Sequence, residues 1–353
     1  MALETLLRTS RLLYEKKFLQ SPNQLFSAIF KTEDADTSAT VLLDEFLQSE
    51  YAVAYRDKNN QAHLRNYTAG SGTLYEPPVA SEKTLIDEVL RDEAVEGSES
   101  TAGFNQAQMR KTDKIVGGHR LAHTMTKNKQ AIDMLRTGVF YAKGIDAADI
   151  GKNEDYARAA GNNLTADFAA VSMDEALTAI NTQLDLQGCP EENRAVIMGQ
   201  SWRTDLQTDS TILTKMQANT ANVLVEQTIN PPLWKGIEGL RWIGRYLPAG
   251  SLSPLDLFGY NPGFLYKASA GATAEAWIPA TEAVAFSFDS PAYRVYRGVD
   301  VVSNNKIERR VGEIVFDDFV SNDPVGENLR STTRHLFLFG DVNHTARSTG
   351  SNF

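Results

Sequence analysis

The first apolar positions of the chain predict a helix that is not followed by a core. The stretch from Leu6 to Leu19 has the spacing of a short helix, and Pro22 then opens a polar run. We therefore expect residues 1–37 to form an N-terminal arm without a core of its own.

Between residues 38 and 77 the apolar positions fall into short runs that are typical of β-strands. Runs at 41–43 and 51–55 precede a polar tip, and Leu64 and Tyr67 follow it, which predicts a long β-hairpin. The charged residues of the tip are Arg56, Asp57 and Lys58. Because two strands alone are marginally stable in water, the hairpin is expected to rest on its own domain or on a neighbouring subunit.

The charge then changes sign along the chain. Residues 82–99 contain seven acidic and two basic residues, whereas residues 105–143 contain eight basic and two acidic ones. In the basic segment, apolar residues recur at helical spacing, which predicts one long helix, bent or interrupted near Gly117 and Gly118. The simplest interpretation of its charge is a solvated helix face.

Residues 150–290 predict a compact α/β domain. A helix is expected to begin at Ser172, where Glu175 completes a capping box, and to end at Gly188. Further expected elements are a buried strand at 195–198, short helices within 201–219, and strands at 240–246, 276–278 and 284–288. The end of the chain returns to strands, at 293–302, 311–320 and 335–339.

Composition and charge exclude several classes of protein. The net charge of -10 and the pI near 5.1 are unfavourable for tight binding to a nucleic-acid backbone. The single cysteine, Cys189, excludes an intrachain disulfide. The chain shows neither a signal-peptide pattern nor an apolar run of ~18 residues, so we expect a soluble, cytoplasmic product.

No combination of residues predicts catalysis or a bound cofactor. His119 and His123 have the spacing of a metal pair, but no glutamate lies between them and no third ligand is evident, so surface or interface histidines are expected. Ser201 follows a predicted strand as in a nucleophile elbow, but the motif lacks its final glycine. The simpler role for Ser201 is a helix N-cap.

Three stretches, in this order, resemble the lambda-type phage major capsid protein family, known as capsid protein E. The first is Tyr75-Glu76-Pro77-Pro78, followed by the acidic segment and then by the helix with His119-Arg120, Asn128-Lys129-Gln130-Ala131 and Leu135-Arg136-Thr137-Gly138. The second runs from Trp277-Ile278-Pro279 to Tyr293-Arg294-Val295-Tyr296-Arg297-Gly298, and the third is Leu336 to Phe339.

This resemblance implies an α+β fold of the Hong Kong 97 type. The N-terminal arm would span residues 1–37 and the extended hairpin loop 38–77. A peripheral domain with the spine helix would span 78–149, an α/β axial domain 150–290, and the return strands of the peripheral domain 291–353. The resemblance also implies a non-enzymatic major capsid protein of a tailed bacteriophage, which self-assembles into hexamers and pentamers of an icosahedral head around double-stranded DNA.

The implied location is the virion capsid, made and assembled in the host cytoplasm, with no cofactor and no membrane. The implied partners are further copies of the chain, a portal protein, an optional decoration protein, and packaged DNA held by loose, non-specific contact. Because the arm is too short for an internal scaffolding domain, a separate scaffold protein is expected. Alternative functions are a tail tube subunit, an encapsulin-like compartment shell, and a hydrolase that uses Ser201.

The charge reversal suggests where subunits meet. We hypothesise that the acidic segment 82–99 packs near the basic helix of another subunit or of its own, with the remaining basic charge facing the lumen. The residues expected at subunit contacts are Arg56, Asp57, Lys58, Asp92, Glu93, Arg110 and Lys114.

Overall fold

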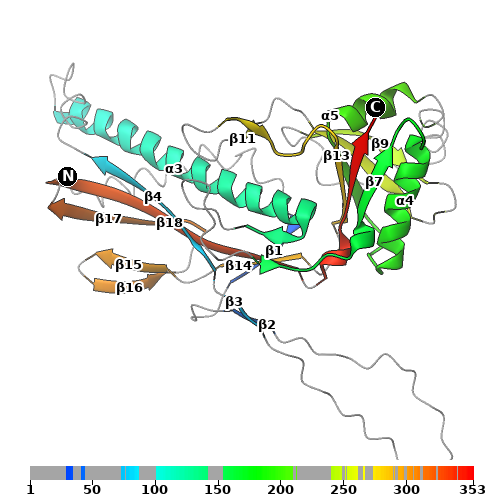
Figure 1. The fold of residues 1–353 in the computed structure, drawn as a ribbon. Helices are drawn as coiled ribbons and strands as arrows, with labels where there is room; N and C mark the ends of the chain where they lie inside the picture. The colour runs from blue at the N-terminus through cyan, green and yellow to red at the C-terminus, as the bar shows by residue number, and fades with distance from the viewer. Residues whose placement is uncertain are drawn as a thin grey trace, which may run out of the picture.

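The described part of the computed structural model contains two large sheets and one long helix that runs along one of them (Figure 1). The residues that the structure describes are 29–34, 41–43, 73–75, 77–86, 101–141, 154–209, 212, 240–248, 251, 253–260, 265–266, 273–288, 290, 293–297, 300–304, 306–310, 313–322, 325–339 and 341–353.

The long helix, α3, spans Thr101–Thr137 and is continuous through Gly117 and Gly118, so the predicted interruption there is wrong. At 37 residues it is about 55 Å long. It ends at Thr137, short of the predicted end at 143, because Gly138 takes a positive φ of 74°. The Gly138 N–H donates to the Met134 carbonyl at 2.7 Å, which closes the last turn.

The first sheet is organised around one strand, β18 (Val325–Phe339), which is 15 residues long. Its first half pairs antiparallel with β4 (Val79–Ile86) and with β17 (Val315–Asn322). Its second half pairs with β14 (Tyr293–Arg297), and β14 pairs in parallel with β1 (Lys31–Asp34). Helix α3 packs along this sheet, as Figure 1 shows.

The end of the predicted arm belongs to this core. Ile29 and Phe30 are buried, and the Phe30 ring lies 4.9 Å from that of Phe337 and 5.7 Å from that of Tyr293. The expectation that residues 1–37 have no core is therefore wrong for 29–34, because an aromatic residue beside β1 fills the space under β14 and β18. The predicted helix from Leu6 to Leu19 lies outside the described residues.

The second sheet has six strands in the order β7-β19-β13-β8-β10-β9. Their bounds are β7 Asn163–Asp167, β19 Ala346–Ser351, β13 Glu282–Ser287, β8 Arg194–Met198, β10 Leu255–Tyr260 and β9 Leu240–Tyr246. Helices α4 (Met173–Leu186) and α5 (Gln200–Thr208) pack on this sheet. The predicted capping box is present: Ser172 accepts from the Glu175 N–H, and the Glu175 carboxylate accepts from the Ser172 N–H.

Strand β19 corrects the prediction that residues 291–353 return as a whole to the first sheet. β19 pairs antiparallel with β13 and in parallel with β7, both in the second sheet. The short helix at Val342–His344 separates it from β18, so the chain passes from one sheet to the other there. The apolar run at the end of β18, Leu336 to Phe339, stops before this short helix, which is why the sequence pattern does not show the passage.

The remaining strands form two-stranded pairs. β2 (Val41–Leu43) pairs with β3 (Thr73–Tyr75), which confirms the base of the predicted hairpin, while its tip lies outside the described residues. The other pairs are β5 (Val139–Phe140) with β6 (Glu154–Asp155), β11 (Leu265–Tyr266) with β12 (Glu275–Ala276), and β15 (Asp300–Asn304) with β16 (Lys306–Arg310).

In the described part of the chain, no helix combines the length and the apolar character needed to span a bilayer.

Candidate functional site: the contacts of the long helix

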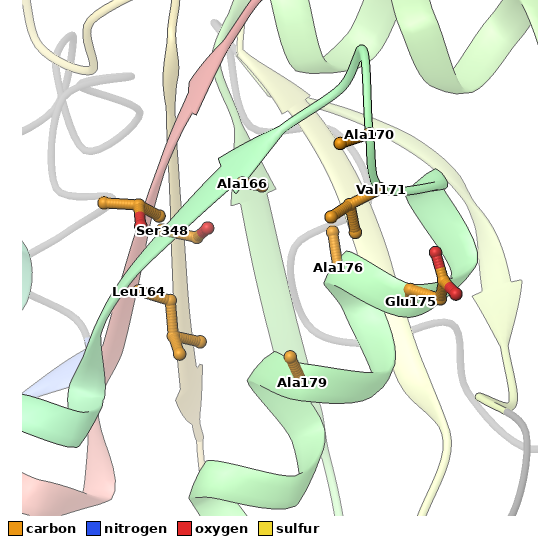
Figure 2. Close-up of a pocket in the computed structure, with 9 residues that line it drawn as sticks. Leu164, Ala166, Ala170, Val171, Glu175, Ala176, Ala179 and Ser348 are labelled. Carbon is orange, nitrogen blue, oxygen red and sulfur yellow. The ribbon is translucent and has the colours of Figure 1, made fainter.

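The surface hollow between β7 and α4 does not have the lining of a catalytic site (Figure 2). It measures about 420 Å³ and is bordered by small and apolar side chains, among them Leu164, Ala166, Val171 and Ala176. Its one charged residue, Glu175, is engaged in the capping box, where the hydrogen bonds from Ser172 lower the pKa of the carboxyl. The described residues also contain no group of three or more histidine, cysteine or acidic side chains that fits a metal ion.

The middle of α3 meets the first sheet through polar side chains. His119 Nε2 lies 2.7 Å from Thr84 Oγ1 of β4, and His119 Nδ1 lies 2.8 Å from Ser331 Oγ of β18. His123 Nε2 lies 2.8 Å from the same Ser331 oxygen. We call these four residues, Thr84, His119, His123 and Ser331, the polar seam.

The seam overturns the prediction that the two histidines lie on a surface or at a subunit interface, because they are buried within the chain itself. His119 is 3% exposed and His123 is 6% exposed. Burial lowers the pKa of His119, although the charge of Glu82 opposes this, and it lowers the pKa of His123 to about 4 with a further contribution from His119. Both imidazoles are therefore neutral at pH 7. Helical spacing identified them as one face, but it does not distinguish a solvated face from a buried polar one.

Toward its C-terminal end the same helix is held by apolar packing. Ala131, Ile132, Met134 and Leu135 are fully buried in the core that also contains β14 and β18. Fully burying side chains of this size contributes roughly 1.5–3 kcal/mol each for the larger ones. The helix is thus anchored at its C-terminal end and attached by polar contacts in the middle.

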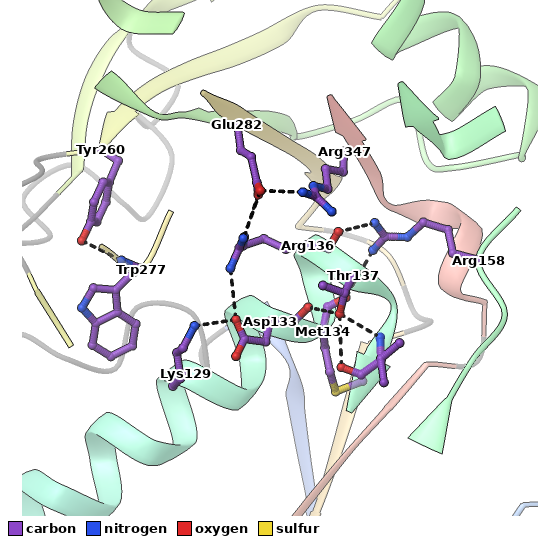
Figure 3. Close-up of polar contacts among 11 residues, drawn as sticks. Lys129, Asp133, Met134, Arg136, Thr137, Arg158, Tyr260, Trp277, Glu282 and Arg347 are labelled. Atoms are coloured by element: carbon purple, nitrogen blue, oxygen red, sulfur yellow. Dashed lines mark hydrogen bonds and ion pairs between the residues drawn. The ribbon is translucent and has the colours of Figure 1, made fainter. Parts of the chain in front are cut away.

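An ionic network ties this anchored end to the second sheet (Figure 3). Arg136 donates to both oxygens of Glu282 on β13, at 2.8 and 3.1 Å, and Arg347 on β19 donates to the same carboxylate at 2.5 Å. Asp133 accepts from Arg136 and from Lys129 on the helix itself. We call Arg136, Glu282 and Arg347 the junction triad.

The Glu282 side chain is only 7% exposed, so its charge depends on the two arginines. Burial alone would raise the pKa of Glu282, but the hydrogen bonds and charges of Arg136 and Arg347 outweigh it and lower the pKa. The carboxylate is ionised across the neutral range. It joins α3, β13 and β19 at one point.

Arg158 caps the end of the long helix. Its guanidinium donates to the carbonyl oxygens of Arg136 at 2.7 Å, Leu135 at 2.6 Å and Met134 at 3.2 Å. Burial lowers the pKa of Arg158 to about 10, so it stays charged at neutral pH. A cation at this place satisfies the carbonyls of Leu135 and Arg136 in the last turn, adds a second bond to that of Met134, and opposes the partial negative charge of the helix C-terminus.

The surroundings of Cys189 disfavour its thiol as a nucleophile, and Ser201 has a structural role in its backbone. Cys189 is buried, and burial raises the pKa of its thiol to about 11, so the thiolate is scarce at neutral pH. Ser201 is not the N-cap that the sequence predicted, since Gly199 caps α5. The Ser201 N–H donates to the Ala280 carbonyl at 3.0 Å, which fixes this turn against the segment before β13.

The predicted subunit-contact residues are mostly beyond what the structure describes. Lys114 lies exposed on α3, and Arg110 lies on the same helix with its side chain outside the described part. The other five, Arg56, Asp57, Lys58, Asp92 and Glu93, lie outside the described residues. The sequence analysis missed the junction triad and Arg158. The one signal for the triad is a glutamate that opens strand β13, where four apolar residues follow it.

By sequence, no family model and no curated protein matches the chain. Solved structures share its fold. A capsid protein of a prophage from E. coli CFT073 superposes with a TM-score of 0.62 over 97% of this chain and 98% of that chain, at 14% identity. The capsid of Ralstonia phage GP4 gives a TM-score of 0.52 at 12% identity, with 91% of this chain and 86% of that chain covered. The mature capsid of bacteriophage PhiM1 gives 0.50 at 10% identity, with 93% and 87% covered.

These likenesses confirm the expected fold. The chain has the Hong Kong 97-type fold of phage capsid proteins, with a long helix along one sheet and an α/β unit beside it. Its assignment to the lambda-type branch of such proteins stays a prediction.

Proposed function

We propose that the chain is the major capsid protein of a tailed bacteriophage. Copies of it assemble into hexamers and pentamers of an icosahedral head that encloses double-stranded DNA. The observation that carries this proposal is the match to the prophage capsid protein, which spans nearly the whole length of both chains at a TM-score of 0.62. A match of that extent accounts for both sheets and the long helix together.

The geometry suits a shell subunit physically. A subunit of a closed shell makes heterologous contacts with several neighbours, and each contact can be weak because the others raise its effective concentration. Such a subunit needs a stiff frame that sets the angle between its contacts. The junction triad and the Arg158 cap supply that stiffness where α3 meets both sheets.

The proposal also covers the binding partners of the chain and its location. The hairpin that rises from β2 and β3 would grasp a neighbouring copy through Arg56, Asp57 and Lys58. A separate scaffold protein, a portal protein, an optional decoration protein and loosely held DNA complete the set. The chain would be made in the host cytoplasm, end in the virion capsid, and have no catalytic role.

Electron microscopy of the expressed full-length chain in negative stain tests the function. We expect closed, roughly spherical particles, with the chain expressed alone or with its scaffold. Open tubes would favour the tail tube alternative, and particles filled with protein instead of DNA would favour the compartment shell. A chain that stays monomeric under every assembly condition would contradict the proposal.

The charge reversal supports a specific subunit contact. The acidic segment that contains Asp92 and Glu93 would pack near the basic part of α3 that contains Arg110 and Lys114. The double substitution Asp92→Lys and Glu93→Lys is expected to lower the yield of closed particles on the order of tenfold, because like charges placed together at an interface are costly. Particle yield is measured by sedimentation of cleared lysate.

A fourfold variant and a control double variant complete this test. Reversing Arg110 and Lys114 to glutamate in the same chain is expected to restore part of the yield. The matched control is Glu191→Lys with Glu192→Lys, which makes the same charge change on an exposed turn of the second sheet and is expected to leave the yield unchanged. Normal shells from the Asp92 and Glu93 variant would refute the contact.

A further inference from the structure

The polar seam forms a directed chain of hydrogen bonds between α3 and the first sheet. It runs from Thr84 through both nitrogens of His119 to Ser331, and from Ser331 to His123. A neutral imidazole has one N–H donor and one acceptor nitrogen, and a hydroxyl donates one bond and accepts others. The chain is therefore fully satisfied, in either direction, when both histidines are neutral.

The number of protons on the two histidines decides whether all hydrogen bonds of the seam can form. With one added proton, His119 donates from both nitrogens, and the Ser331 hydroxyl still donates to His123. With two, both imidazoles donate to the Ser331 oxygen, and its own proton has no acceptor left within the seam. Two cations then share one oxygen in a buried place, which is costly because neither is paired with an anion.

The surroundings do not supply such an anion by direct contact. Neither imidazole has an ion pair with a carboxylate within the described residues, and Glu82 on β4 acts on His119 through its charge alone. On β17, the Phe316 ring stacks on the His119 ring, with the two ring centroids 6.5 Å apart. The nearby acidic residue Asp318 pairs in register with Leu329 of β18 and not with Ser331.

The other charged groups around the seam are engaged elsewhere or carry the same sign. Asp317 accepts from Arg330 at 2.6 Å, and Glu313 accepts from Lys127 at 3.0 Å. Arg120 of α3 lies over the Phe316 ring. The cations on the sheet strands are Lys83 on β4 and Arg330 and Arg334 on β18, and His335 of β18 bonds to Thr333.

From this geometry we propose that the polar seam is a proton-operated latch, which holds the middle of α3 on β4 and β18 while its histidines are neutral and releases it when both are protonated. The buried apolar residues at the C-terminal end of α3, together with the junction triad, keep that end of the helix in place during release. The latch is a property of the folded subunit, so the inference goes beyond the proposed function and holds whether or not the chain forms a shell.

The direction of the pH response follows from burial. The pKa of each histidine is lower in the folded chain than its ordinary value of 6.5, and that of His123 is about 4. A depressed pKa means that the unfolded or released state binds more protons. The stabilisation by the seam is therefore complete above about pH 6.5 and decreases as the pH falls toward 4.

Hydrogen exchange of the full-length chain, followed by mass spectrometry and corrected for the intrinsic effect of pH, tests the latch. Between pH 7 and pH 4.5 we expect protection to fall at least about tenfold in residues 113–130 and 327–334. Protection in α4 and β13 should not change. A uniform loss over all elements, or no loss in the seam, would overturn the proposal.

Variants separate the latch from general acid sensitivity. The double variant His119→Gln with His123→Gln keeps hydrogen-bonding side chains that do not titrate, and it is expected to lose the acid response. His344→Gln, a histidine outside the seam that bonds to Ser290, is the matched control and should keep it. If the double variant does not fold, Ser331→Ala replaces it and is expected to loosen the same segments already at pH 7. An acid response in the double variant equal to that of the native chain would contradict the latch, as would unchanged protection at pH 7 in Ser331→Ala.

Discussion

Replacing Glu282 with alanine is expected to lower the free energy of unfolding by about 3–5 kcal/mol. The substitution leaves Arg136 and Arg347 without the carboxylate that now accepts three hydrogen bonds from them. The Arg136 side chain is only 14% exposed, so water replaces the lost hydrogen bonds poorly. Within the network, Asp133 is then the one carboxylate that still pairs with Arg136. Urea-induced unfolding, read by circular dichroism, measures the change.

The matched control for this variant is Glu275→Ala. Glu275 is an exposed glutamate on the short strand β12, and its removal is expected to change the unfolding free energy by no more than about 0.5 kcal/mol. The Glu282→Ala subunit should also form fewer or irregular particles, because the angle between α3 and the second sheet is no longer fixed. Equal stability of the two variants would show that the triad does not hold the junction.

Gly199→Ala is expected to destabilise the chain by about 3 kcal/mol or more, since overpacking against backbone leaves little room for relief. A Cβ atom at Gly199 would lie 2.1 Å from the Pro279 carbonyl oxygen and 2.6 Å from that of Ala280. That backbone is held in place, because the Gly199 N–H donates to the Glu282 carbonyl at 2.8 Å. Thermal unfolding of the purified variant measures the loss.

Gly118→Ala is the same substitution at a site where we expect it to stabilise the chain. Gly118 lies exposed in the middle of α3, and a Cβ there would meet nothing within 4 Å. Alanine favours the helix over glycine by about 1 kcal/mol, so this variant should be slightly more stable than the native chain. If both variants were destabilised alike, or if Gly199→Ala were neutral, the close packing between α5 and the segment before β13 would be wrong.

The local sequence pattern predicted which helices and strands exist better than it predicted where they end and which elements lie beside them. The capping box at Ser172 and the buried strand at 195–198 depend on residues close together in sequence, and both were confirmed. The end of α3 was misplaced because the basic segment was taken as one helix through residue 143, whereas Gly138, with its positive φ, stops the helix at Thr137. The passage of the chain to β19 was missed because strand pairing at this distance leaves no periodic signal.

The polar contacts of α3 were the hardest feature to predict. Helical spacing placed His119 and His123 on one face, but only the sheet, whose Ser331 lies more than two hundred positions further along the chain, shows that this face is buried. The same holds for Arg136, whose partner Glu282 lies on a distant strand. A buried polar group is explained by its partner, and the partner is known only once the fold is known.

The most direct test of the central claim is a cryo-electron microscopy reconstruction of particles formed by the full-length chain. We expect a closed icosahedral shell in which subunits are grouped in fives and sixes, each with α3 as one unbroken rod of about 55 Å beside its sheet. Particles without five-fold groups, or a subunit density that does not accommodate the helix and both sheets together, would contradict the account.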